Sequence, residues 1–135
     1  MPNQPSPSTP SHRCVRVLIV DDMPQVRQEL RGVLQLTGEL EVVGEAANGL
    51  EAISQAEALR PDVVVMDLEM PVLDGFEATR QIKERGLAGH VVVLSVHTDS
   101  DNLQRARQAG ADVFIDKASR FKTLMSAIVV VRQSI

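Results

Sequence analysis

Residues Pro61-Asp62-Val63-Val64-Val65-Met66-Asp67-Leu68-Glu69-Met70-Pro71-Val72-Leu73-Asp74-Gly75 carry the strongest structural signal in this chain. A short apolar run bounded by turn residues is typical of a strand buried on both faces of a parallel sheet. Ligands bind such sheets at the carboxyl ends of the strands. The run ends at Asp67, so the pattern predicts a carboxylate where ligands gather. The alternative interpretation is an aspartate that merely caps a turn.

The composition is that of one soluble globular domain. The chain has 135 residues, of which 44% are hydrophobic and 24% charged, and its formal net charge is -4. This balance does not favour nucleic acid, so we expect no direct nucleic-acid binding by this domain. No stretch has the length of a membrane span and no signal-peptide pattern opens the chain, which predicts no membrane contact and a cytoplasmic location. The single cysteine, Cys14, cannot form an internal disulfide.

The two ends of the chain differ in character. Residues 1–13 contain Pro2, Pro5, Pro7 and Pro10 among small polar residues, which predicts a disordered Pro/Ser-rich tail. Residues 14–135 form the predicted folded domain. Strands are expected at 15–20, 41–45, 63–67, 91–94 and 113–115, and helices at about 24–36, 48–59, 76–85, 100–110 and from about 119 onward.

This alternation of strands and helices predicts an α/β fold with a parallel sheet covered on both faces. Two doubly wound strand orders are common, and five strands favour 2-1-3-4-5 over the six-stranded dinucleotide-binding order. The predicted fold is therefore a flavodoxin-like (βα)5 domain.

Polar residues follow four of the five predicted strands. Asp21 and Asp22 follow the first, Asp67 ends the third, Ser95 ends the fourth, and Lys117 lies just beyond the fifth. The first and third strands are neighbours in the 2-1-3-4-5 order, so the three acids meet at its switch point. Ser95 and Lys117 lie on the adjacent strands and can reach toward Asp67.

Three carboxylates so close together require either a proton or a cation. Oxygen ligands without His or Cys indicate a hard cation, and Mg²⁺ fits because it binds through few carboxylates and phosphate oxygens. With Lys117 and Ser95 alongside, the set suits a site that receives a phosphoryl group on Asp67, the nucleophile. No Walker loop or Gly-rich nucleotide fingerprint is present, so ATP is not expected as the direct donor.

The motifs resemble those of response-regulator receiver domains of two-component signalling. The resemblance runs from about Arg13 to Ser134, and the segments 41–52 and 93–117 look most like receivers that precede a LuxR-type helix-turn-helix domain. Its motifs are Leu18-Ile19-Val20-Asp21-Asp22, Met66 through Gly75, Leu94-Ser95 and Phe114-Ile115-Asp116-Lys117.

The resemblance implies a role for each acid. Asp67 would be the phosphoacceptor, phosphorylated by a sensor histidine kinase or a phosphotransfer protein. Asp22 would bind Mg²⁺ directly, and Asp21 mainly through water. The backbone carbonyl of Glu69 would complete the protein ligands.

The resemblance also implies a switch. Ser95 and Phe114 match the family's switch pair, and Lys117 matches its active-site lysine. The switch aromatic is often Tyr, and Phe114 lacks that hydroxyl. Proline with a cis bond often follows the lysine, whereas this chain has Ala118, before which a cis bond would cost about 2.5–4 kcal/mol.

Two loop residues are candidates for tuning the lifetime of the acyl phosphate. Glu69 lies two residues after Asp67, and His97 two residues after Ser95. Side chains at these positions can flank the path of the hydrolytic water. The alternative, that both are ordinary solvent-exposed loop residues, has equal weight.

The leading functional hypothesis is a phosphorylation-controlled switch, not an enzyme. It would be either a single-domain regulator that acts by protein contact or as a phosphate carrier, or the receiver part of a transcription regulator whose DNA-binding part is absent from this sequence. Within these 135 residues we expect no output domain after the last predicted helix. A homodimer could form through the face of helix four, strand five and helix five, or through helices one and five.

A Mg²⁺-dependent aspartyl-phosphate-type phosphatase, with Glu69 as general acid, is the alternative function. A flavin-binding protein fits least, because three acids would repel the phosphate of the flavin.

Overall fold

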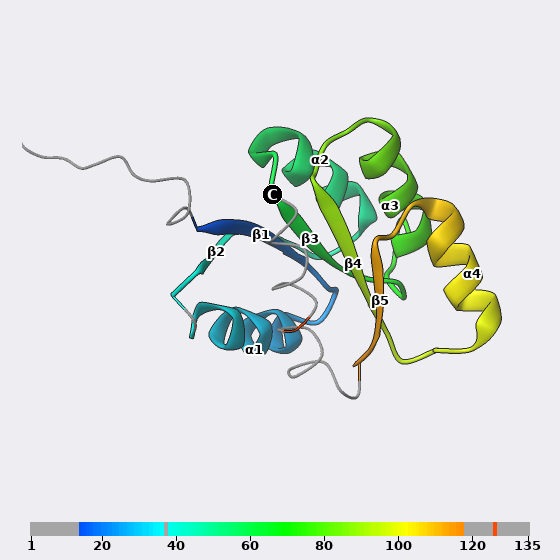
Figure 1. Ribbon diagram of the computed structural model, residues 1–135, viewed down its shortest axis with the longest axis horizontal. Helices are drawn as coiled ribbons and strands as arrows, with labels where there is room; N and C mark the ends of the chain where they lie inside the picture. The colour runs from blue at the N-terminus through cyan, green and yellow to red at the C-terminus, as the bar shows by residue number, and fades with distance from the viewer. Residues whose placement is uncertain (1–13, 37, 118–125, 127–135) are drawn as a thin grey trace, which may run out of the picture.

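The computed structural model describes residues 14–36, 38–117 and 126 (Figure 1). The predicted tail at 1–13, the peptide bond before Ala118 and the predicted helix from about 119 lie outside these residues. The elements are β1 Val15–Val20, α1 Pro24–Gln35, β2 Leu40–Ala46, α2 Gly49–Leu59, β3 Val63–Asp67, α3 Gly75–Glu84, β4 His90–Ser95, α4 Ser100–Ala109 and β5 Val113–Asp116.

The five strands form one parallel sheet in the order β2-β1-β3-β4-β5, which confirms the predicted fold class. Figure 1 shows α1 on one side of the sheet and α2 and α3 on the other. Successive strand residues alternate between the two faces. Val17 and Ile19 join the core beneath α1, whereas Leu18 and Val20 join the core beneath α2 and α3.

The strand register brings the polar residues to one edge. Val20 of β1 pairs with Met66 of β3, Asp67 pairs with Leu94 of β4, and Ser95 pairs with Asp116 of β5. Because the strands are parallel and in step, their carboxyl ends lie side by side. The residues that end them or follow them therefore share one edge of the sheet.

Aspartates in the turns organise the loops. Asp74 is the N-cap of α3 and accepts a hydrogen bond from the Glu77 amide at 3.0 Å. Asp112 accepts one from the Val91 amide at 2.8 Å, which ties the start of β5 to β4. Within the described residues, no helix is both long and apolar enough to cross a membrane.

Candidate functional site

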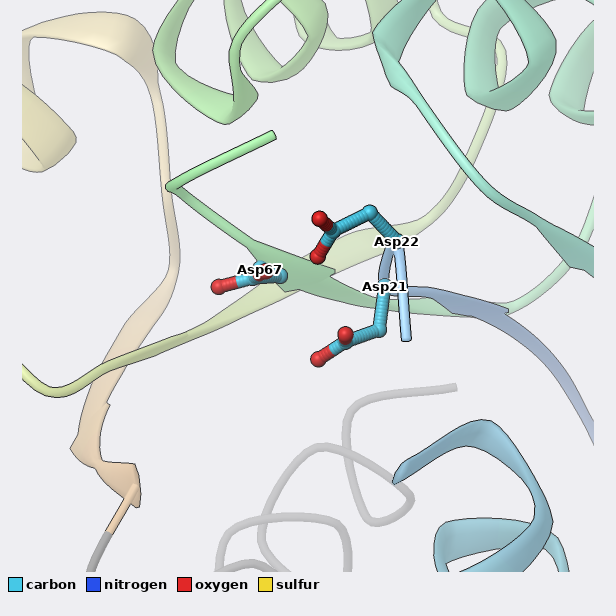
Figure 2. A group of neighbouring side chains, drawn as sticks. All are labelled: Asp21, Asp22 and Asp67. Atoms are coloured by element: carbon cyan, nitrogen blue, oxygen red, sulfur yellow. The ribbon is translucent and has the colours of Figure 1, made fainter. Parts of the chain in front are cut away.

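Three aspartates converge at the carboxyl edge of the sheet, as the sequence predicts. Asp21 and Asp22 follow β1, and Asp67 is the last residue of β3 (Figure 2). One carboxylate oxygen from each lies within 4.8 Å of the other two. Asp21 and Asp67 are 1% and 2% exposed, whereas Asp22 is exposed. Clustered carboxylate oxygens with one solvent-facing ligand suit a hard cation that retains part of its water shell, so the donor set fits Mg²⁺.

The ammonium group of Lys117 lies between the two buried acids. Its Nζ is 2.9 Å from Oδ2 of Asp21 and 3.3 Å from Oδ1 of Asp67. Burial acts against the charged form of this lysine, but its hydrogen bond to Asp21 and the charge of Asp67 outweigh burial and raise the pKa of Lys117. The lysine is therefore a fixed positive charge at the position where an anion would approach Asp67.

Asp67 is the acid whose ionisation the site opposes most clearly. Burial first, and then the charge of Asp21, raise the pKa of Asp67 to about 6. Lys117 acts in the opposite direction, and Glu69 adds a smaller increase. A divalent cation among the acids would remove this penalty and keep the carboxylate ionised, as a nucleophile requires.

Backbone contacts fix Asp21. The Met23 amide donates a hydrogen bond to its Oδ1 at 2.9 Å. Its own amide donates to the Ala46 carbonyl of β2 at 3.0 Å. These bonds direct Oδ2 toward Lys117.

Ser95 lies at the same edge, but its hydroxyl bonds elsewhere. Its Oγ accepts a hydrogen bond from the His97 amide at 2.9 Å, and lies 3.2 Å from both Oε2 of Glu69 and the His97 carbonyl. Among the described contacts none joins Ser95 to Asp67. The position of Ser95 at the end of β4 agrees with the predicted approach to Asp67. In this structure, however, its hydroxyl bonds Glu69 and the His97 backbone instead.

Phe114 occupies β5 opposite Val93 of β4. Its ring is half-buried against the core beneath α2 and α3, and it lines a groove with Leu103 and Ala106 of α4. The aromatic predicted to act with Ser95 therefore lies at the junction of β5 and α4.

Comparison with models of known protein families identifies the family of this chain. The model for the response regulator receiver domain matches residues 17–129, most of the chain. The chain belongs to the response-regulator receiver family. This match gives no support to the phosphatase alternative.

Individual relatives agree with this assignment. The nitrate/nitrite response regulator protein NarL of Escherichia coli is 34% identical over 83% of this chain and 52% of its own length. The chemotaxis protein CheY of Halobacterium salinarum is 38% identical over 84% of this chain and 92% of its own length. The chain therefore spans about half the length of the NarL relative and nearly all of the CheY relative.

Solved receiver structures have the same fold. The receiver domain of a putative response regulator NarL from Mycobacterium tuberculosis has a TM-score of 0.85 at 30% identity, covering 91% of this chain and 99% of that one. A LuxR-family two-component response regulator from Aurantimonas sp. has a TM-score of 0.82 at 34% identity, covering 89% and 86%. The resemblance to LuxR-type receivers is thereby confirmed.

Two residues beside the receiver site were not anticipated from the sequence. Arg27 of α1 donates a hydrogen bond from Nη1 to the carbonyl oxygen of Asp21 at 2.7 Å, and Glu45 of β2 holds the same guanidinium. Glu45 offered a weak signal, as a charged residue near the carboxyl end of a strand. Arg27 offered none, because its spacing fits an ordinary solvent-facing helix position.

Proposed function

We propose that this chain is a phosphorylation-controlled signalling switch in which Asp67 accepts the phosphoryl group. The observation that carries this proposal is the position of the Lys117 ammonium, which pairs with both Asp21 and Asp67. A carboxylate oxygen of Asp22 lies in the same cluster. We assign Mg²⁺ to Asp21, Asp22, Asp67 and the backbone carbonyl of Glu69. Bound there, Mg²⁺ would neutralise charge on the phosphoryl oxygens.

The transfer step uses the chain's own residues as follows. The ionised carboxylate of Asp67 attacks phosphorus in line, and a new O–P bond forms as the P–N bond of a partner's phosphohistidine breaks. The departing imidazole keeps the electron pair and takes a proton from solvent. Lys117 pairs with a phosphoryl oxygen, which releases part of its hold on Asp21. A sensor histidine kinase or a phosphotransfer protein is the proposed donor.

A switch requires that the new group be sensed. Ser95 would exchange its contact with Glu69 for one with a phosphoryl oxygen, and Phe114 would turn into the space that the serine leaves. The surface of α4 and β5 would then change, through two states close in free energy. Structures with and without beryllofluoride should differ at Ser95 and Phe114; identical positions in the two would refute this switch.

Glu69 and His97 are proposed to tune the lifetime of the acyl phosphate. Glu69 is exposed and bonded to Ser95, so its carboxylate lies near the path of an attacking water. We expect Glu69→Asn and His97→Ala each to change the half-life of phosphorylated protein, measured by phosphate release. Unchanged half-lives would make both residues ordinary loop residues.

The relatives support a proposal about the output. We propose that the switch feeds transcription regulation through a separate domain, or acts by contact with a protein partner, in the cytoplasm. Homodimerisation through α4 and β5, or through α1, in each case with the predicted last helix, belongs to the same proposal. Sedimentation with and without beryllofluoride tests it, because activation should change the fraction of dimer.

The direct test is incubation with acetyl phosphate and Mg²⁺ followed by intact mass. We expect one phosphoryl group per chain, and none after chelation or in Asp67→Ala. A chain that instead hydrolyses p-nitrophenyl phosphate over many turnovers would be a phosphatase. Stoichiometric modification that then stops is the behaviour of a switch.

A further inference from the structure

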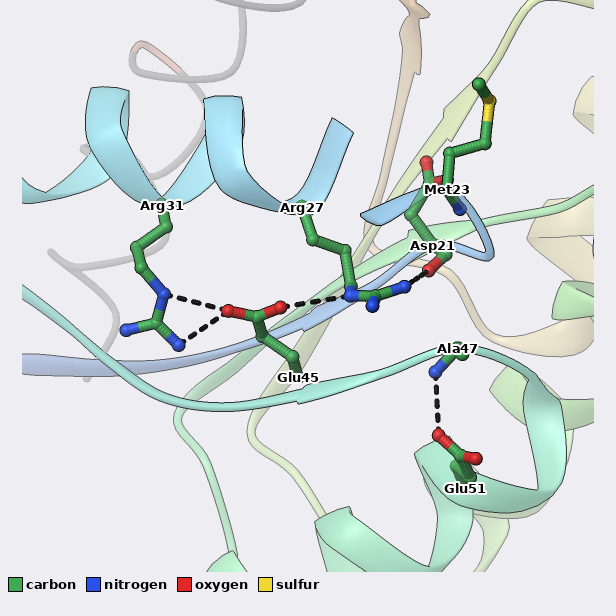
Figure 3. Close-up of polar contacts among 7 residues, drawn as sticks. All are labelled: Asp21, Met23, Arg27, Arg31, Glu45, Ala47 and Glu51. Carbon is green, nitrogen blue, oxygen red and sulfur yellow. Dashed lines mark hydrogen bonds and ion pairs between the residues drawn. The ribbon is translucent and has the colours of Figure 1, made fainter. Parts of the chain in front are cut away.

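A cluster of charged side chains lies next to the acidic site but outside it (Figure 3). It consists of Arg27 and Arg31 of α1 and Glu45 of β2, and we call it the Glu45 cluster. Nε of Arg27 lies 3.0 Å from Oε1 of Glu45, and Nε of Arg31 lies 2.8 Å from Oε2. The two arginines lower the pKa of Glu45 despite its partial burial, so the cluster carries one net positive charge at neutral pH.

The two arginines differ in their contacts and in their burial. Nη1 of Arg27 donates a hydrogen bond to the backbone carbonyl of Asp21 at 2.7 Å. Arg31 contacts Glu45 and, in the described part of the chain, does not reach Asp21. Arg27 is also the more buried of the two, with 17% of its side chain exposed against 37% for Arg31. Only the first arginine therefore connects the Glu45 cluster to the acidic site.

The backbone of Asp21 is consequently held to β2 through both its amide and its carbonyl. Its amide bonds the Ala46 carbonyl directly, and its carbonyl bonds Glu45 through Arg27. The N-cap position of α1 contacts the Asp21 side chain and not this part of its backbone, because the Met23 amide donates to Oδ1 of the carboxylate at 2.9 Å. The direction of the Asp21 carboxylate depends on this backbone, since the side chain is attached to the Cα between the amide and the carbonyl.

We propose that Arg27 is a positioning residue for metal binding: by bonding the Asp21 carbonyl it holds the Asp21 backbone against β2, so that the Asp21 carboxylate keeps the orientation that Mg²⁺ requires. This inference rests on the proposed function. Residues that orient metal ligands without touching the metal commonly affect metal affinity strongly.

Charge and positioning predict opposite results when Arg27 is removed. A positive side chain near a cation site repels the cation, so its loss would strengthen Mg²⁺ binding through space. Loss of a positioning contact would weaken binding. The direction of the change therefore separates the two roles.

The experiment measures Mg²⁺ binding to the full unphosphorylated chain by isothermal titration calorimetry, well below the unfolding temperature of each variant. We expect Arg27→Gln to raise the Mg²⁺ dissociation constant about tenfold. Arg31→Gln is the matched control, because it removes the same charge from the same carboxylate without touching Asp21. Its dissociation constant should stay within about twofold of wild type.

A kinetic measurement separates positioning from general damage. The rate of phosphorylation by acetyl phosphate, followed against Mg²⁺ concentration, should reach the wild-type maximum in Arg27→Gln but require about tenfold more Mg²⁺. Arg27→Lys retains the charge but cannot bond Glu45 and the Asp21 carbonyl through one planar group, so it should give an intermediate dissociation constant. If Arg27→Gln does not fold, Arg27→Lys against Arg31→Lys is the deciding comparison.

Equal Mg²⁺ affinities for the Arg27 and Arg31 variants, or tighter binding in the Arg27 variant, would overturn the positioning role while leaving the proposed function intact. Failure of the wild-type chain to bind Mg²⁺ would overturn the proposed function itself. The two failures are thus distinguishable in one set of titrations.

Discussion

The surroundings of Asp67 oppose the ionisation of its carboxyl group. It is 2% exposed, it faces Asp21, and its pKa is raised to about 6 from the ordinary 3.8. Between these two pH values the folded chain binds more protons than the unfolded chain. Stability from this residue is therefore lost as the pH rises through that window, and the full penalty is present above it.

Asp67→Asn should consequently stabilise the metal-free protein in a pH-dependent way. We expect a gain of about 2 kcal/mol in the free energy of unfolding at pH 7.5, falling toward zero below pH 4. Urea unfolding in the presence of a chelator, repeated across this range, measures it. A gain that does not vary with pH would show that ionisation of Asp67 is not the cause.

Lys117 offsets part of that repulsion, and its removal should separate stability from chemistry. Lys117→Gln leaves two buried carboxylates without their cation, so we expect a loss of about 3 kcal/mol in metal-free stability. Mg²⁺ affinity should be maintained or increased, because a competing positive charge is gone. Labelling by acetyl phosphate should fall at least about tenfold, since the phosphoryl oxygens lose their partner. Labelling at the wild-type rate would contradict the role assigned to the lysine.

At the scale of elements, the start of α3 must approach the end of β3 closely. A Cβ added at Gly75 would clash with the Asp67 carbonyl oxygen and lie 2.7 Å from the Cα of Leu68. The Gly75 amide also bonds the Leu68 carbonyl at 3.0 Å. The glycine thus allows the helix to begin directly against the residue proposed as phosphoacceptor.

Gly75→Ala should therefore destabilise the fold and disturb the site. We expect a loss of about 2 kcal/mol or more, together with weaker Mg²⁺ binding. Gly32→Ala is the control, because Gly32 lies in α1 with no atom within 4 Å of an added Cβ. That change should stabilise the chain by about 0.5–1 kcal/mol. Equal effects at the two positions, by thermal unfolding, would contradict the close approach.

The elements were predictable where the sequence itself encodes their environment. β1, β3 and β4 consist mainly of apolar residues that are buried on both faces of the sheet, and these apolar runs predicted the strands. The partner of the Ser95 hydroxyl was not predictable, because it depends on how two loops fold over the sheet edge. The bond from Arg27 to the Asp21 carbonyl was not predictable either, because a long side chain can satisfy a helix surface in many ways.

At the scale of the whole molecule, one topological fact gathers the site. Parallel strands in the order β2-β1-β3-β4-β5 place the ends of β1 and β3 side by side, although Asp21 and Asp67 are far apart in sequence. Lys117 follows β5 directly and completes the set by pairing with both Asp21 and Asp67. A ligand that bridges these strands must stabilise the entire fold, because the residues that bind it separate from one another on unfolding.

Location of the modified residue tests the central claim most directly. The chain is treated with acetyl phosphate and Mg²⁺, the acyl phosphate is reduced with borohydride to leave homoserine, and the peptides are sequenced by tandem mass spectrometry. We expect homoserine at position 67. Homoserine at position 21 or 22 with an unmodified Asp67 would contradict it.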